Sequence, residues 1–201
     1  AFLNKALQQA PELKLARSLL VTNYLRGGLP AKALNSLQPV LDKIDTDAVF
    51  LALAGEAYLQ SGDPKKAEEY FDKANKLDPG NPSWRTSLAL SHMAQGDVAT
   101  AITELERVSS VDKGITADRA LIASYLRRNE LDKALAAIDV LQKKQPDNPA
   151  TYIVRARILL AKKDNTGARQ SFENAVALNP AYIPAVAGLA AERRAPLGIV
   201  P

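Results

Sequence analysis

Cysteine is absent from this 201-residue sequence, and histidine occurs once, at position 92. Disulfide bridges, thiolate metal sites and cysteine nucleophiles are therefore excluded, and a single histidine cannot supply an imidazole-based triad. The sequence also lacks an apolar run approaching the ~20 residues that a membrane-spanning helix needs. We therefore expect no metal, no cofactor and no membrane insertion by these residues.

A strong charge of one sign is missing as well. The formal net charge is +4, and pairs of basic residues such as Lys65-Lys66 and Lys143-Lys144 are interleaved with acids. A nucleic-acid surface would concentrate its basic residues on one face. The pattern favours solvated helix faces and argues against nucleic-acid binding. With 47% hydrophobic and 24% charged residues, the chain should fold around a core of its own.

What the sequence does contain is a repeat. The stretch AYLQSGDPKKAEEYFDKANKLDP, residues 57–79, returns along the chain with a small residue pair, an aromatic or large residue, a turn signal and a closing proline at matching places. Such self-similarity indicates a repeat architecture. Four units are 34 residues long and the third is one residue shorter. The units are 14–47, 48–81, 82–114, 115–148 and 149–182, with partial units at 1–13 and 183–194.

Each unit is predicted to be a helical hairpin, because its apolar residues recur at three and four positions on either side of a central turn. In the second unit, Gly62-Asp63 makes the turn, Asp63 is the expected N-cap and Pro64 opens the second helix. Ala54, Gly55 and Ala67 are small where the two helices should cross. One hairpin cannot cover its apolar faces alone, so neighbouring hairpins must stack. We expect a single all-α solenoid over residues 1–194 and an irregular tail at 195–201.

The repeat resembles the tetratricopeptide repeat (TPR) family, and LAGEAYLQSGDPKKAEEYFDKANKLDP is similar to the family pattern throughout. The resemblance implies a right-handed α-solenoid whose concave face, lined by the first helix of each hairpin, receives a segment of another protein. Three departures stand out. Leu51 replaces the family's tryptophan, Pro39 should kink or end the second helix of its unit, and the third unit ends in SSVDKGIT without its proline.

The resemblance also places a set of side chains on the concave face, which we predict to bind the partner. The set is Thr22, Leu25, Arg26, Glu56, Leu59, Leu90, Met93, Arg119, Ala123, Leu126, Arg157 and Leu160. Apolar anchors mixed with arginines suit a partner segment that is apolar with some acidic character. The leucines in this set could instead be ordinary helix-packing residues, and His92 is expected to pack rather than to react.

Several stretches of the sequence, among them GARQSFENAVALNPAYIPAVAGLA, resemble long bacterial TPR lipoproteins of the PEP-CTERM/exosortase sorting and exopolysaccharide systems. That likeness implies a periplasmic protein, membrane-anchored through a missing segment, and a cytoplasmic protein is the alternative. The partial units at both ends lead us to expect a piece of a longer array. We therefore predict a non-enzymatic interaction scaffold. A structural spacer, end-to-end self-association and the docking arm of a larger enzyme remain alternatives.

Overall fold

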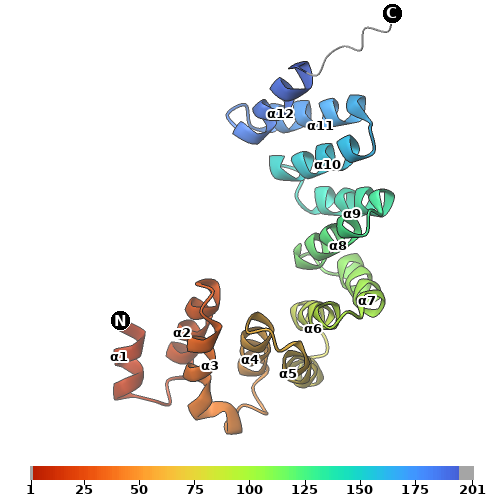
Figure 1. Ribbon diagram of the computed structural model, residues 1–201. Coiled ribbons are helices and arrows are strands. Elements are labelled where there is room, and N and C mark those ends of the chain that lie inside the picture. The colour runs from red at the N-terminus through yellow and green to blue at the C-terminus, as the bar shows by residue number, and fades with distance from the viewer. Residues whose placement is uncertain (1, 195–201) are drawn as a thin grey trace, which may run out of the picture. The chain divides into compact units, whose positions relative to one another are not determined.

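The computed structural model describes residues 2–194, so Ala1 and the predicted irregular tail at 195–201 lie outside the described residues. Within that range the chain forms twelve α-helices and one 3-10 helix and no strand (Figure 1), which confirms the all-α class. The elements are α1 (Phe2–Gln9), α2 (Lys14–Arg26), α3 (Pro30–Leu37), the 3-10 helix η1 (Gln38–Lys43), α4 (Ala48–Gln60), α5 (Pro64–Leu77), α6 (Pro82–Ala94), α7 (Val98–Val111), α8 (Thr116–Arg127), α9 (Leu131–Lys144), α10 (Pro149–Ala161), α11 (Asn165–Leu178) and α12 (Ile183–Arg194).

The helices pack as hairpins that stack on one another. α2 packs on α3, α4 on α5, α8 on α9 and α10 on α11. Neighbouring hairpins then meet through α3 and α4, α5 and α6, α9 and α10, and α11 and α12. In these pairs each helix packs against its neighbour along the chain, as the solenoid prediction requires.

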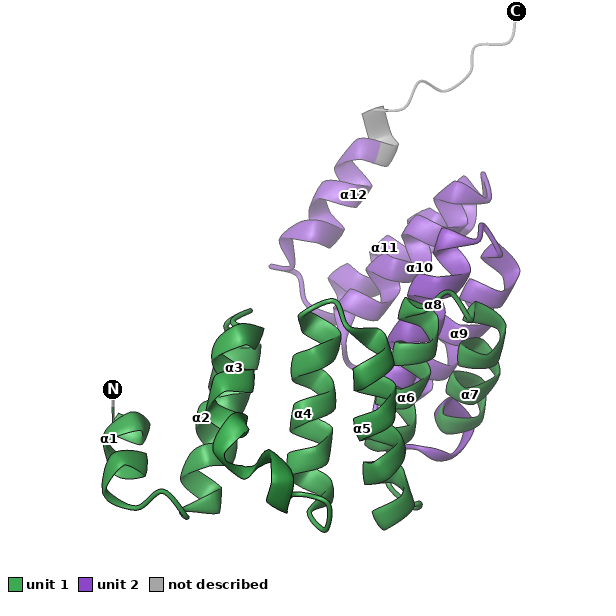
Figure 2. Ribbon diagram, turned by 60° about the horizontal axis from the view of Figure 1, so that its bottom comes forward, with its two compact units in different colours: residues 1–108 green, residues 109–201 purple. Residues whose placement is uncertain are grey.

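The chain divides into two compact units, residues 1–108 and 109–201 (Figure 2), and α7 begins in the first and ends in the second. The larger side chains in the core of the first unit are Val21, Leu25, Leu37, Ile44, Phe50, Leu51 and Phe71. A core cluster of the second unit contains Ile153, Ala156, Leu159, Ala168, Phe172, Ala175 and Ala185. Each unit therefore buries apolar side chains of its own.

The turn inside each hairpin depends on a residue in the left-handed backbone region. Gly28, Gly62 and Gly96 have φ angles of 65°, 85° and 92°, while Asn129 and Lys163 adopt 57° and 64° in the later units. Glycine reaches this region without steric cost, and asparagine tolerates it better than most residues. The backbone thereby repeats at the period of the sequence.

Aspartates cap the second helices of three hairpins. The Asp63 side chain accepts a hydrogen bond from the Lys66 backbone N–H at 3.1 Å, and Asp164 accepts from the Gly167 N–H at 2.9 Å. Asp97 accepts from the Thr100 N–H at 3.2 Å, and hydrogen bonds from Thr100 hold the pKa of its carboxyl below its ordinary value. The predicted N-cap at Asp63 is confirmed, and these bonds satisfy backbone donors that the helix leaves free.

Proline interrupts the second helix of the first full hairpin, as the sequence predicts. α3 ends at Leu37, and Pro39 lies in the first turn of η1, which runs to Lys43. Proline lacks the backbone donor that would continue the α-helical pattern. The corresponding helix of the next hairpin, α5, continues without a break from Pro64 to Leu77.

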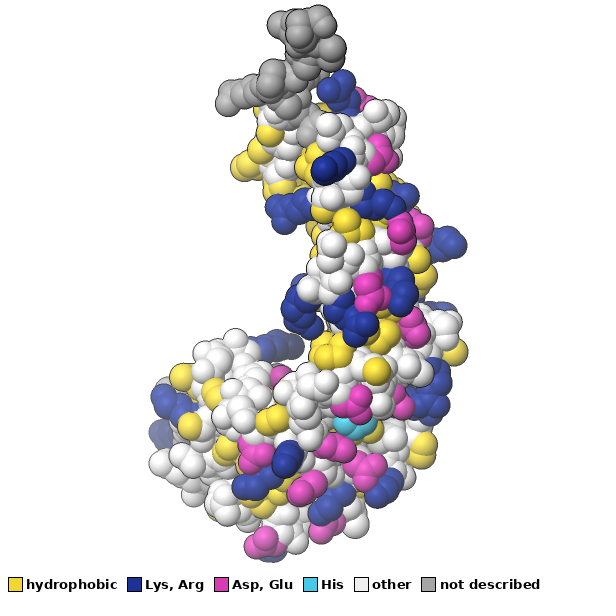
Figure 3. Space-filling model, turned by 45° about the vertical axis from the view of Figure 1, so that its right-hand side comes forward, with side chains coloured by type: hydrophobic (Ala, Val, Ile, Leu, Met, Phe, Trp, Pro, Cys, Tyr) yellow, Lys and Arg dark blue, Asp and Glu magenta, His cyan; other side chains and the backbone are white. Residues whose placement is uncertain are grey.

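His92 is half-buried between α5 and α6. Its Nε2 lies 3.3 Å from Glu68 Oε1, and Gln95 Nε2 donates a hydrogen bond to Glu68 Oε2 at 2.5 Å. Glu68 thus links α5 to His92 of α6 and to Gln95 in the turn that follows α6. In Figure 3 the histidine lies beside acidic side chains, and both acidic and basic side chains are exposed on the face drawn.

The crossing of α4 and α5 leaves no room for a side chain at Gly55. A Cβ built there would lie 2.7 Å from Phe71 Cε1, and Phe71 is 1% exposed, so its ring cannot move away into solvent. Ala54 and Ala67 are fully buried at the same crossing. The prediction that small residues mark the crossing is confirmed, because a larger residue would force the helices apart.

Replacing Gly55 by valine should lower the free energy of unfolding by about 1–3 kcal/mol, because the buried Phe71 ring must be displaced. Urea titration followed by circular dichroism would measure the change. Gly80→Ala is the matched control, since the nearest heavy atom to its added Cβ is 3.8 Å away. An equal midpoint for both variants would contradict the steric role of Gly55.

Candidate functional site

A groove within the second unit lies between α8 and the start of α10. It encloses about 430 Å³. Its lining residues are Ile115, Arg119, Ile122, Ala123, Leu126, Leu141, Gln145, Asn148, Ala150, Thr151 and Val154. Most of these side chains are apolar, with one arginine and two amides among them, a composition typical of binding sites.

Helical periodicity decides which side of α8 faces this groove. Ala117, Leu121 and Tyr125 are buried toward the core. Arg119, Ala123 and Leu126 follow one another at intervals of four and three residues, share the opposite face and are exposed. The same amphipathic pattern that anchors α8 therefore turns these three side chains into the groove.

Arg119 is the charged group of the groove. Its side chain is exposed, and no carboxylate within residues 2–194 forms an ion pair with it. A guanidinium offers five N–H donors in a planar fork. Gln145, from the end of α9, lines the same groove and has its amide NH₂ free of protein partners in the described chain. The two side chains together present unpaired donors beside an apolar wall.

The α10 side of the groove is held by a compact hydrogen-bond cluster. Asn148 caps α10 by accepting from the Ala150 N–H at 3.0 Å, and its own amide donates to Gln145 Oε1 at 2.8 Å. The buried Thr151 hydroxyl donates to the Asn148 carbonyl oxygen at 2.8 Å. These bonds fix the position of Gln145 and of the first turn of α10 relative to each other.

The predicted partner-binding residues are divided between the two units. Arg119, Ala123 and Leu126 come together in the groove, while Arg157 and Leu160 lie further along α10, exposed and half-buried respectively.

In the first unit, one predicted residue belongs to the core and the others keep some exposure. Leu25 is only 7% exposed and packs in the core, which matches the alternative of a helix-packing role. Arg26 is exposed. The half-buried members are Thr22, Glu56, Leu59, Leu90 and Met93.

Several groove residues were not predicted. Gln145 and Asn148 come from the end of a second helix and the loop after it, whereas the prediction counted first helices only. Ile122 directly precedes the predicted Ala123, and Val154 lies three residues before the predicted Arg157. The amphipathic pattern could have indicated Ile122, but nothing in the local sequence marks Gln145 as a groove residue.

A comparison with protein families matches this architecture. Profiles described as tetratricopeptide repeat match residues 18–82, 58–120 and 119–183. The chain belongs to the tetratricopeptide repeat family. A comparison of this TPR chain with curated proteins gives no match.

Solved structures of TPR proteins share the fold. The chain is 17% identical to YrrB, described as a TPR protein with an unusual peptide-binding site, with a TM-score of 0.58 and coverage of 92% of this chain and 96% of that one. It is 22% identical to MamA from Desulfovibrio magneticus RS-1, with a TM-score of 0.62 and coverage of 83% and 97%. TTC0263, a thermophilic TPR protein of Thermus thermophilus, is 17% identical, with a TM-score of 0.64 and coverage of 88% and 97%. The TPR fold is a scaffold for protein–protein interaction.

Residues 2–194 contain neither a membrane-spanning helix nor a cluster of metal ligands. None of their helices is both long and apolar enough to cross a bilayer. In the same range, no three His, Asp or Glu side chains gather as the ligands of a metal ion would.

A buried ion pair braces α8 next to Arg119. Asp118 is fully buried, and Lys144 Nζ lies 2.7 Å from its Oδ2. The Ser109 hydroxyl donates to Asp118 Oδ1 at 2.5 Å, and Lys144 also donates to the carbonyl oxygens of Ser109 at 2.9 Å and Gly114 at 3.2 Å. The prediction that Lys144 lies on a solvated face is therefore wrong, because its ammonium ties the end of α9 to Ser109 in the last turn of α7, to Gly114 in the loop and to Asp118 of α8.

Removing one member of this pair should destabilise the TPR chain strongly. Asp118→Leu leaves the Lys144 ammonium without its counter-ion, which should cost about 3 kcal/mol or more, and adding Lys144→Met should recover part of that loss. Chemical denaturation of both variants would measure it.

The matched control for this prediction is Asp139→Ala, whose carboxylate pairs with Arg155 at a site where the Asp139 side chain is 51% exposed. It should cost less than about 1 kcal/mol. Equal losses for Asp118→Leu and Asp139→Ala would argue against the brace.

Proposed function

We propose that the chain is a non-enzymatic scaffold that binds a segment of a partner protein in the groove between α8 and α10. The observation that carries the proposal is an unpaired, exposed Arg119 placed beside the apolar side chains of Leu126 and Val154 in one groove of about 430 Å³. The partner segment would be apolar with at least one acidic residue. The peptide-binding site named for YrrB supports the same general use of the fold.

The chemistry of the groove sets the role of each group. A carboxylate of the partner would accept from the Arg119 guanidinium, which can form two parallel hydrogen bonds with it. The Gln145 amide would donate to a backbone carbonyl of the segment. Leu126 and Val154 would bury its apolar side chains, and burial of apolar surface supplies most of the affinity in such grooves.

The remaining predicted residues would extend the contact. Arg157 and Leu160 continue along α10 from the groove. The first unit offers its own partly exposed first-helix residues, such as Glu56 and Arg26, to the same or another part of the partner. A longer partner could thus be bound at several points along the chain.

The cellular setting that we propose is a bacterial protein-sorting or exopolysaccharide system, with the chain periplasmic or membrane-anchored through a further segment. Its support is the resemblance of several stretches of the repeat, such as GARQSFENAVALNPAYIPAVAGLA, to PEP-CTERM-associated TPR lipoproteins. A cytoplasmic location is the alternative. Self-association is a second candidate role, favoured by the exposed Leu15 on α2, at 73%, and Ile183 on α12, at 79%.

Peptide display on the whole chain tests the groove directly. Random peptides selected on the wild-type chain should be rich in apolar residues with an Asp or Glu, and they should bind Arg119→Glu at least about tenfold more weakly in fluorescence anisotropy, because a charge-assisted pair is replaced by repulsion. Leu126→Asp should weaken binding similarly.

Arg169→Glu is the matched control, because Arg169 is an exposed arginine of α11 that does not line the groove. It should leave the affinity of the selected peptides unchanged. Selected peptides that bind wild type, Arg119→Glu and Leu126→Asp equally would remove the groove from consideration, and light scattering would then test self-association.

A further inference from the structure

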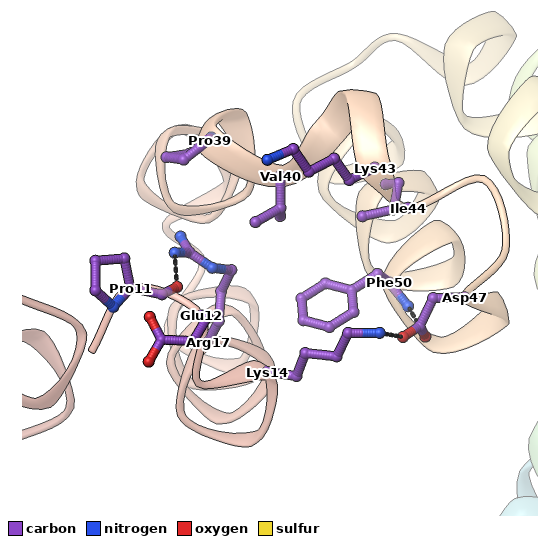
Figure 4. A pocket seen from close by; sticks show the side chains of 10 residues that line it. All are labelled: Pro11, Glu12, Lys14, Arg17, Pro39, Val40, Lys43, Ile44, Asp47 and Phe50. Atoms are coloured by element: carbon purple, nitrogen blue, oxygen red, sulfur yellow. Dashed lines mark hydrogen bonds and ion pairs between the residues drawn. The ribbon is translucent and has the colours of Figure 1, made fainter.

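A second cavity, of about 330 Å³, lies within the first unit where α2, η1 and α4 meet (Figure 4). Its apolar wall comes mainly from Val40 and Ile44 at η1 and from Phe50 on α4. The full lining is Pro11, Glu12, Lys14, Arg17, Pro39, Val40, Lys43, Ile44, Asp47 and Phe50. None of the predicted partner-binding residues is among them.

The cavity accompanies a departure from the repeat pattern. In this hairpin η1, with Pro39 in its first turn, stands where a regular second helix would have its last turns. Val40 of η1 and Ile44, which directly follows it, supply two of the apolar residues of the cavity wall. α5, the matching helix of the next hairpin, keeps its α-helical form to Leu77. The cavity is thus a property of this hairpin rather than of the repeat as such.

Arg17 is a buried cation in the cavity wall. It is 6% exposed, and its Nη1 and Nη2 donate to the carbonyl oxygens of Ser36 at 2.6 Å and Pro11 at 2.7 Å. No carboxylate in the described part of the chain pairs with it. A buried charge is costly without a counter-ion. Two backbone carbonyls use two of the five N–H donors, so others remain for an acceptor in the cavity.

A purely structural role explains only part of this arrangement. Arg85 occupies the matching place two hairpins later and donates to the Pro79 carbonyl oxygen at 2.5 Å, just as Arg17 donates to Pro11. The bond to the preceding proline is therefore a shared brace. Arg85, however, is only half-buried, whereas Arg17 is withdrawn from solvent beside an open cavity.

The other charged groups of the cavity leave it cationic. Lys14 pairs with Asp47 at 3.1 Å. Among the lining residues this leaves Arg17 and Lys43 against Glu12, and Lys43 is exposed at the rim with no ion-pair partner within residues 2–194. The cavity therefore combines an apolar wall with an excess of positive charge, which favours an anion that carries an apolar body.

We propose that this cavity binds a small monocarboxylate with an apolar chain. Its carboxylate accepts from the Arg17 guanidinium and the Lys43 ammonium, and its chain packs against Val40, Ile44 and Phe50. A volume of 330 Å³ stands at the lower end of the range of about 300–1,000 Å³ for ligand pockets, so it suits a small molecule and not a helix of a partner. The site is separate from the α8–α10 groove and does not depend on its function.

Octanoate is the probe, tested on the full chain by calorimetry and by amide chemical-shift mapping. We expect saturable binding of one octanoate, with the largest shifts at Val40, Ile44 and Phe50. Octanamide has the same chain without the charge and should bind at least about tenfold more weakly, because it loses the charge-assisted bonds. Acetate has the charge without the chain and should not saturate the site.

Three variants separate binding from folding. Arg17→Gln should weaken octanoate binding at least about tenfold. Since this change also removes two braces, Val40→Phe provides an independent test by filling the cavity while Arg17 remains. Lys43→Gln should weaken binding measurably, and the matched control Lys32→Gln, an exposed lysine of α3 outside the cavity, should not.

The proposal is overturned if octanoate shows no saturable binding to the wild type, if octanoate and octanamide bind equally, or if binding to the folded Val40→Phe variant is unchanged. Shifts confined to α8 and α10 would also overturn it, because they would place octanoate in the other groove.

Discussion

Close approach of neighbouring helices is the constraint on which the rest of the structure depends. Gly55 meets the ring of Phe71 inside a hairpin, and Gly188 of α12 meets the ring of Phe172 of α11 between successive hairpins. In both places the glycine, which has no side chain, leaves the space that a buried aromatic ring occupies. Because each hairpin is too thin to bury its own apolar faces, these tight crossings let the stack form a core one layer at a time. The surface positions of every first helix follow from that stacking.

Local features of the fold could be predicted because their causes are local. Gly62 permits the left-handed turn, Asp63 caps the helix that follows, and Pro39 ends α3 through its own missing donor. Lys144 was misjudged for the opposite reason. A lysine next to another lysine resembles a solvated pair in the sequence, and only the fold brings Asp118 to it. Arg17 was likewise not singled out, because its acceptors lie on two other segments.

The candidate groove shows the same limit. The face of α8 that carries Arg119 and Leu126 follows from the spacing of its buried residues, so the sequence sufficed there. The depth of the groove depends on where α10 begins, which Asn148 fixes by capping that helix and by donating to Gln145 across the loop. Gln145 becomes a groove residue only through that loop geometry. A face can be predicted from periodicity, whereas a cavity requires the neighbouring element to be placed.

Buried polar residues occur in this chain where the repeat pattern is irregular. Leu51 fills one position of the second hairpin as a fully buried apolar residue, and the matching residues of the first and fourth hairpins are Arg17 and Asp118. Both are buried, and both bond to segments where the pattern is irregular: Arg17 near the Pro39 break, Asp118 beside the shortened third unit. Where the backbone is irregular, some carbonyl and hydroxyl groups lack their usual hydrogen-bond partners. A polar side chain can bond to these groups, whereas an apolar side chain would leave them unsatisfied. These two polar residues also lie close to the cavities of their units, since Arg17 lines the cavity beside η1 and Asp118 directly precedes Arg119 of the groove.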